Sequence, residues 1–203
     1  MYFVKTPNII KPLYRDFIWN LPNDSLEVYL TFDDGPTPEI TDQVFKILAE
    51  FDALATFFLV GENIENHPSY LDKYSQLGHS IGNHSYSHFN GWHTEKEKYL
   101  EDIARCGKII PGKLFRPPYG KITRSQAKEV KTNYKLIMWD VLSGDFDSRV
   151  DGDQCTLNVT TNVESGSIIV FHDSLKASKT MLTSLPQILG NLSERGFKFK
   201  ALA

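Results

Sequence analysis

Two adjacent aspartates and a pair of histidines are the side chains of this sequence best suited to chemistry. Asp33 and Asp34 follow the apolar run Leu26–Phe32, and His84 and His88 stand four residues apart. Neighbouring carboxylates repel each other unless a cation or an arginine lies close by. Imidazoles at positions i and i+4 project from one face of a helical turn and can converge on one ion. Two histidines and one carboxylate leave a coordination position open, as in catalytic sites for zinc or another divalent first-row metal.

Each of these features also has a purely structural interpretation when it is taken alone. The aspartates could form a turn with Gly35 before a helix capped by Thr37, and two histidines at this spacing also arise by chance. The combination favours the metal site, because the strand-end carboxylates supply the third ligand. His67, His79 and His93 are not accompanied by other candidate ligands, and we interpret them as surface or strand-end residues.

Alternating strands and helices must position these side chains. Short β-rich runs are predicted at Leu26–Phe32, Ala55–Val60, Ser80–Asn83, Lys113–Arg116, Lys135–Trp139, Ser167–His172 and Phe197–Ala201. Helical spacing of apolar residues indicates helices at Pro38–Phe51, Pro68–Leu77, Thr94–Ile109, Arg124–Thr132, Gly152–Val163 and Lys179–Arg195. This pattern predicts an α/β protein, a distorted (β/α)7-type barrel of parallel strands with outer helices.

The carboxyl ends of the predicted strands carry further polar clusters. Arg116 and Tyr119 follow one strand, Asp145 follows the next, and His172 ends a third. In such barrels the active site collects at this end of the sheet. Each residue alone could be a turn, an ordinary loop acid or a satisfied strand-end histidine, but their convergence at one end favours a catalytic site.

The length, charge and cysteine content of the whole chain exclude several classes of function. The chain has 203 residues and a net charge of −3 with no basic run, which excludes the usual electrostatic footprint of a nucleic-acid binder. Cys106 and Cys155 lie far apart without a CxxC context, so we expect thiols and no zinc ribbon. No secretory signal or membrane-spanning run is evident, and we expect a cytoplasmic protein.

The predicted domain organisation is simple. We expect residues 1–25 to be an N-terminal extension that packs on the barrel, and residues 26–203 to form one catalytic domain. Within the extension, residues 9–19 could form a short amphipathic helix that contacts a membrane surface, although packing against the domain is the commoner fate of such a segment.

Five segments resemble, in order, the motifs of a known family. They are Thr31–Pro36 (TFDDGP), His84–His88 (HSYSH), Arg116–Gly120 (RPPYG), Ser143–Phe146 (SGDF) and Val170–His172 (VFH). In combination they resemble the polysaccharide deacetylases, also called the NodB-homology or carbohydrate esterase family 4 domain. The resemblance spans Leu26 to Leu202, and its first three motifs are the most specific.

The resemblance implies a role for each matching residue. Asp34, His84 and His88 would bind one divalent metal, zinc in most members and cobalt or nickel in some. Asp33 would be the general base, oriented by Arg116. The backbone N–H of Tyr119 would stabilise the oxyanion, while His172, hydrogen-bonded to Asp145, would protonate the leaving amine. The substrate-binding positions carried over in this way are Pro118, Tyr119, Phe146 and Val170.

Departures from the family pattern concern the acetyl pocket. Leu142 replaces the first residue of the fourth motif, Phe146 replaces its usual tryptophan, and Val170 replaces the usual leucine of the fifth motif. A phenyl ring keeps an apolar wall but is smaller than an indole and has no N–H donor. Pocket size and sugar stacking are therefore expected to differ from those of typical members.

The resemblance implies a metal-dependent hydrolase that removes N-acetyl groups from N-acetylated amino sugars, such as GlcNAc-containing fragments of peptidoglycan or chitin. One alternative is a deacetylase or deformylase of a small or lipid-linked sugar precursor. Others are a metal amidohydrolase acting on a small cyclic amide, and a carbohydrate-binding pseudoenzyme. An open groove with exposed aromatic residues would favour a polysaccharide, and Tyr86, Phe89, Trp92 and Tyr119 are candidates to line it.

Overall fold

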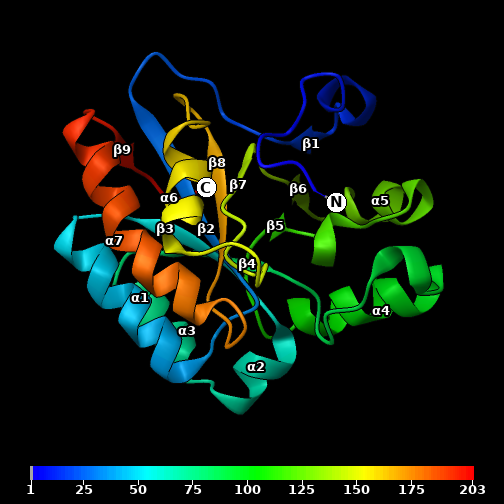
Figure 1. The fold of residues 1–203 in the computed structure, drawn as a ribbon. Helices are drawn as coiled ribbons and strands as arrows, with labels where there is room; N and C mark the ends of the chain where they lie inside the picture. The colour runs from blue at the N-terminus through cyan, green and yellow to red at the C-terminus, as the bar shows by residue number, and fades with distance from the viewer. Residues whose placement is uncertain (1) are drawn as a thin grey trace.

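A curled sheet of nine parallel strands forms the centre of the molecule. The computed structural model describes residues 2–203 and orders the strands β1-β6-β5-β4-β3-β2-β8-β7, with β9 paired to β2. The strands are β1 (Phe17–Ile18), β2 (Glu27–Asp33), β3 (Ala55–Leu59), β4 (Ser80–Asn83), β5 (Leu114–Phe115), β6 (Lys135–Ile137), β7 (Val141–Leu142), β8 (Ile168–His172) and β9 (Lys198–Phe199). Helices cover the outside of the sheet, which confirms the predicted distorted α/β barrel (Figure 1).

The helices follow their strands as crossover connections. They are α1 (Pro38–Glu50), α2 (Gly61–Asn66), α3 (Tyr70–Gln76), α4 (Lys96–Gly107), α5 (Arg124–Val130), α6 (Gly152–Thr160) and α7 (Ser178–Glu194). Local sequence fixes several helix starts: Pro38 is the first residue of α1, Thr123 and Gln126 form a capping box at α5, and Asp151 caps α6. The short helix α2 and the strands β1 and β7 were absent from the prediction.

Successive side chains along a strand point alternately to the outer and the inner face of the sheet. Val28, Leu30 and Phe32 of β2 are fully buried in the large core cluster that also contains apolar residues of α1 and α7, two helices that lie side by side (Figure 1). The intervening Thr31 and Asp33 face the barrel interior, where Arg116 contacts both. The outward-facing residues therefore form the core between sheet and helices, whereas inward-facing positions can carry the polar residues predicted to form the functional site.

The N-terminal segment is part of the sheet. Lys5 forms an antiparallel bridge with Val141 of β7, whereas Phe17 and Ile18 pair with β6. Since β1 and β7 are the two ends of the strand order, residues 5–18 connect its two edges. The amphipathic helix considered for residues 9–19 does not form: the segment contains a 3-10 turn (Lys11–Tyr14) followed by strand β1. None of the described helices has the length and apolar character needed to cross a bilayer.

A buried carboxylate anchors this segment. Asp140 has no exposed surface and accepts hydrogen bonds from Lys5 Nζ at 2.6 Å, Lys11 Nζ at 2.8 Å and Ser167 Oγ at 2.6 Å. Burial would raise the pKa of Asp140, but the bonds from Lys11 and Lys5 outweigh it and hold this pKa below its usual range. The folded chain therefore gains stability from the ionised form.

We expect the Asp140→Asn substitution to lower the free energy of unfolding by about 3 kcal/mol at pH 7, measured by urea denaturation, because two ammonium groups lose a buried partner. The loss should shrink as the pH falls below about 4, where the wild-type carboxylate is protonated in the unfolded chain and then in the folded one. Asp42→Asn is the control: it breaks the exposed pair with Lys73 (Nζ to Oδ1 2.9 Å) and should cost less than about 1 kcal/mol. Equal effects of both substitutions would contradict the anchoring role of Asp140.

Candidate functional site

The site lies at the carboxyl ends of β2, β4 and β8. The parallel register of β2 and β8 pairs Asp33 with His172, and both residues lie at the last position of their strands. Beyond β2, Asp34 adopts a left-handed backbone conformation, with φ of 81°. The change of backbone direction lets two consecutive carboxylates reach the same site from one strand end.

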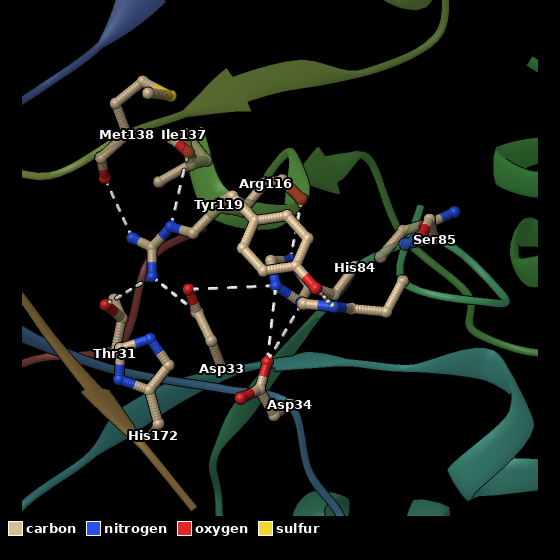
Figure 2. Close-up of polar contacts among 12 residues, drawn as sticks. Thr31, Asp33, Asp34, His84, Ser85, Arg116, Tyr119, Ile137, Met138 and His172 are labelled. Carbon is tan, nitrogen blue, oxygen red and sulfur yellow. Dashed lines mark hydrogen bonds and ion pairs between the residues drawn. The ribbon is translucent and has the colours of Figure 1, made fainter. Parts of the chain in front are cut away.

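Arg116 organises the first of these carboxylates. Its guanidinium is fully buried, and Nη1 donates to Asp33 Oδ1 at 2.7 Å and to Thr31 Oγ1 at 2.7 Å. Nη2 donates to the Met138 carbonyl at 2.9 Å, and Nε points to the Ile137 carbonyl at 3.4 Å (Figure 2). This fork fixes Asp33 Oδ1 and compensates its charge, while Oδ2 stays 4.0 Å from His84 Nε2.

Asp34, His84 and His88 form a cluster that could hold a metal ion. One ligand atom from each residue lies within 4.8 Å of the others. Asp34 Oδ1 is 3.2 Å from His88 Nε2 and 3.8 Å from His84 Nε2, and its backbone carbonyl accepts a hydrogen bond from Asn63. Burial would raise the pKa of Asp34, but the hydrogen bond from His88 and the positive charge of His172 hold it well below its usual range.

The hydrogen bonding of His84 tests whether this cluster fits a cation. His84 Nδ1 lies 2.7 Å from the backbone carbonyl of Arg116, which can only accept, so Nδ1 carries the proton. Burial lowers the pKa of His84 to about 4, which leaves the ring neutral and its Nε2 lone pair facing Asp34. Two electron-pair donors that face each other with no proton between them fit a metal ion.

A second carboxylate–histidine pair, Asp145 and His172, lies at the end of β8. Asp145 accepts from the backbone N–H of His172 at 2.7 Å and contacts its Nδ1 at 2.8 Å. Burial would lower the pKa of His172, but the Asp145 carboxylate raises it to about 9. Because Asp145 holds Nδ1, the Nε2 atom is the one available to donate a proton into the site.

These groups surround a cavity of about 770 Å³. Eight of the residues predicted from the sequence contribute to its lining, namely Asp33, Asp34, His84, His88, Tyr119, Phe146, Val170 and His172. Arg116 and Asp145 lie behind the lining and reach it through Asp33 and His172. Pro118 is buried under the turn that presents Tyr119 and does not line the cavity.

The aromatic residues expected along a groove lie in different places. Tyr119 lines the cavity, with 60% of its surface exposed and its hydroxyl 3.2 Å from His88 Nδ1. Tyr86 is buried in the core, and Phe89 packs against a second apolar cluster. Trp92 is 60% exposed but lies outside the cavity lining.

Sequence reasoning missed several residues of the lining. Asn63 lies in α2, which follows β3, and Trp139 lies just after β6, while Leu175 and Lys176 lie in the loop that follows β8. Tyr2 comes from the N-terminal segment, far from every motif. Asn63, Trp139, Leu175 and Lys176 lie close to strand ends in the sequence, and this position could have suggested them. Tyr2 reaches the site only because residues 4–6 pair with the chain around β7.

The family assignment follows from comparison with known sequences. Residues 21–136 match the family described as polysaccharide deacetylase. The chain belongs to the polysaccharide deacetylase family. It is a hydrolase of carbohydrate esterase family 4, as the motifs of the sequence predicted.

Individual polysaccharide deacetylases resemble the chain over most of its length. It is 35% identical over 192 residues to a peptidoglycan-N-acetylglucosamine deacetylase of Bacillus cereus, covering 89% of this chain and 68% of the relative. A chitooligosaccharide deacetylase of Azorhizobium caulinodans is 32% identical over 196 residues, which cover 86% of this chain and 92% of the relative. A crystal structure of a peptidoglycan N-acetylglucosamine deacetylase in complex with a benzamide ligand superimposes with a TM-score of 0.87 at 32% identity, covering 97% of this chain and 95% of that one.

Proposed function

We propose that this polysaccharide deacetylase hydrolyses the N-acetyl group of N-acetylglucosamine residues in peptidoglycan or a related oligosaccharide, releasing acetate and a free amine. The observation that carries the proposal is that the Asp33–Arg116 and Asp145–His172 pairs bring Asp33 and His172 to the same cavity as the Asp34, His84 and His88 cluster. The similarity to peptidoglycan and chitooligosaccharide deacetylases supports this class of substrate.

A divalent metal would be held by Asp34, His84 and His88. We propose zinc, with cobalt or nickel as alternatives, because two imidazoles and one carboxylate suit these ions. When bound, the metal supplies a Lewis acid that polarises the amide carbonyl and lowers the pKa of water.

The protein's own residues supply the proton transfers. Asp33 takes the proton of the attacking water through Oδ2, the oxygen that Arg116 does not hold. The backbone N–H of Tyr119, at the rim of the cavity, donates to the oxyanion of the tetrahedral intermediate. His172 Nε2 then donates a proton to the sugar nitrogen, the C–N bond breaks, and acetate and the amine leave.

The experiment is a measurement of acetate release by the zinc-reconstituted protein. The substrates run from N-acetylglucosamine through its oligomers to peptidoglycan fragments, with a chelator-treated sample beside each one. We expect release that the chelator abolishes and that increases with oligomer length, because the cavity of about 770 Å³ exceeds what one acetylated amino group fills. Release from N-formyl sugars alone would favour the deformylase, and no release with metal bound would contradict the proposal.

A further inference from the structure

Tyr2 places a residue of the N-terminal segment in the wall of the substrate cavity. Its ring centroid is 5.2 Å from that of Phe146, and both side chains line the cavity. The Tyr2 hydroxyl donates to Asp147 Oδ2 at 3.0 Å. Tyr2 thus contacts the loop after β7 at two points, one apolar and one polar.

Phe146 carries this contact to the proposed acid. The Phe146 and His172 rings meet edge to face, with centroids 5.1 Å apart and an interplanar angle of 72°. Phe146 therefore contacts both Tyr2 and His172. Because His172 must approach the amide nitrogen, the wall beside it borders the acyl group that is removed.

The backbone is anchored two and four residues after Tyr2. Leu142 N donates to the Val4 carbonyl at 2.8 Å, and Thr6 N donates to the Asp140 carbonyl at 2.8 Å. At Gly144, where φ is 83°, an added Cβ would lie 3.2 Å from the Tyr2 hydroxyl, so the loop and the ring approach closely. Tyr2, held by its ring and hydroxyl and followed by an anchored backbone, can set the width of the wall that it supports.

We propose that Tyr2 is a positioning residue that holds Phe146 against His172 and thereby restricts the cavity to small acyl groups. This inference rests on the proposed deacetylase function. It names a determinant of acyl-group size that lies in the N-terminal segment, outside the five motifs. Without the Tyr2 ring, Phe146 can tilt away from His172 and admit a longer acyl chain.

The first test compares kcat/KM for the N-acetyl and N-propionyl forms of a glucosamine tetramer, using protein with a C-terminal tag. In Tyr2→Ala we expect the acetyl-to-propionyl ratio to fall about tenfold, the lower end of what one methylene contributes in an apolar pocket. Tyr2→Phe keeps the ring and should restore the ratio relative to Tyr2→Ala. The control is Phe3→Ala, because Phe3 is 61% exposed and lies outside the lining. An unchanged ratio in Tyr2→Ala would overturn the proposal.

The second test requires no substrate. It uses the proton NMR signals of the His172 imidazole C–H groups, which are assigned by their loss in His172→Gln. The ring current of the adjacent Phe146 shifts these signals. They should move in Tyr2→Ala and stay near their wild-type positions in Tyr2→Phe and Phe3→Ala. If they do not move in Tyr2→Ala, the positioning role is overturned even in an active enzyme. If they move but the wild type releases no acyl group, the proposed function fails and the positioning of Phe146 by Tyr2 stands.

Discussion

We expect the Asp33→Asn substitution to lower kcat by about 100-fold or more while zinc binding is retained, because a positioned general base contributes about 10² to 10⁴ in rate. Asparagine has the shape of aspartate, and its amide oxygen can still accept from Arg116 Nη1, which lies 2.7 Å from Oδ1 in the wild type. The amide cannot take up a proton from water. The substitution therefore removes the base and preserves the buried hydrogen bonds of the guanidinium.

The measurement pairs turnover on an N-acetylglucosamine oligomer with zinc content per chain. Asp42→Asn is a suitable control: it changes an aspartate that pairs with Lys73 and lies outside the cavity lining. Near-normal turnover in Asp33→Asn would remove Asp33 from the role of base. Loss of zinc in the same variant would show that Asp33 acts as a ligand.

The site residues that could be predicted from the sequence were predictable for one physical reason. Asp33 and His172 each end a run of buried, β-forming residues, and parallel strands bring such ends to one edge. His84 and His88 follow the end of β4, the second neighbour of β2 in the sheet, so their convergence with Asp34 followed once the strands were placed. Local pattern and the rule for parallel sheets were enough to predict this part of the site.

The parts that were missed depend on contacts between distant segments. β1 and β7 contain two residues each, too few for a periodic pattern, and pairing with β6 and β8 defines them. The apolar residues near Phe17 suggested a helix, but hydrogen bonding to the edge of β6 determines their conformation. The position of Tyr2 follows from the same kind of contact, since it depends on the bridge between Lys5 and Val141.

The His84→Ala substitution is expected to abolish zinc retention and turnover together. Nδ1 of His84 is held by the Arg116 carbonyl, so Nε2 is directed toward Asp34 and the proposed metal position. Even residues that only orient a ligand contribute about 10- to 100-fold to metal affinity, and the loss of a ligand should exceed this range. Zinc affinity is measured by competition with a fluorescent chelator, alongside acetate release and a thermal unfolding curve.

His93→Ala is the matched control, because His93 is an exposed histidine in the 3-10 turn Gly91–His93 and takes no part in the cluster. It should keep both zinc and turnover. The unfolding curve separates loss of the ligand from loss of the fold, since His84 is buried and its removal leaves a space beside Arg116. A folded His84→Ala protein that still binds one zinc per chain with wild-type affinity would contradict the assignment of His84 as a ligand. It would leave Asp34 and His88, with Asp33 4.0 Å from the lost nitrogen, as the groups to consider in its place.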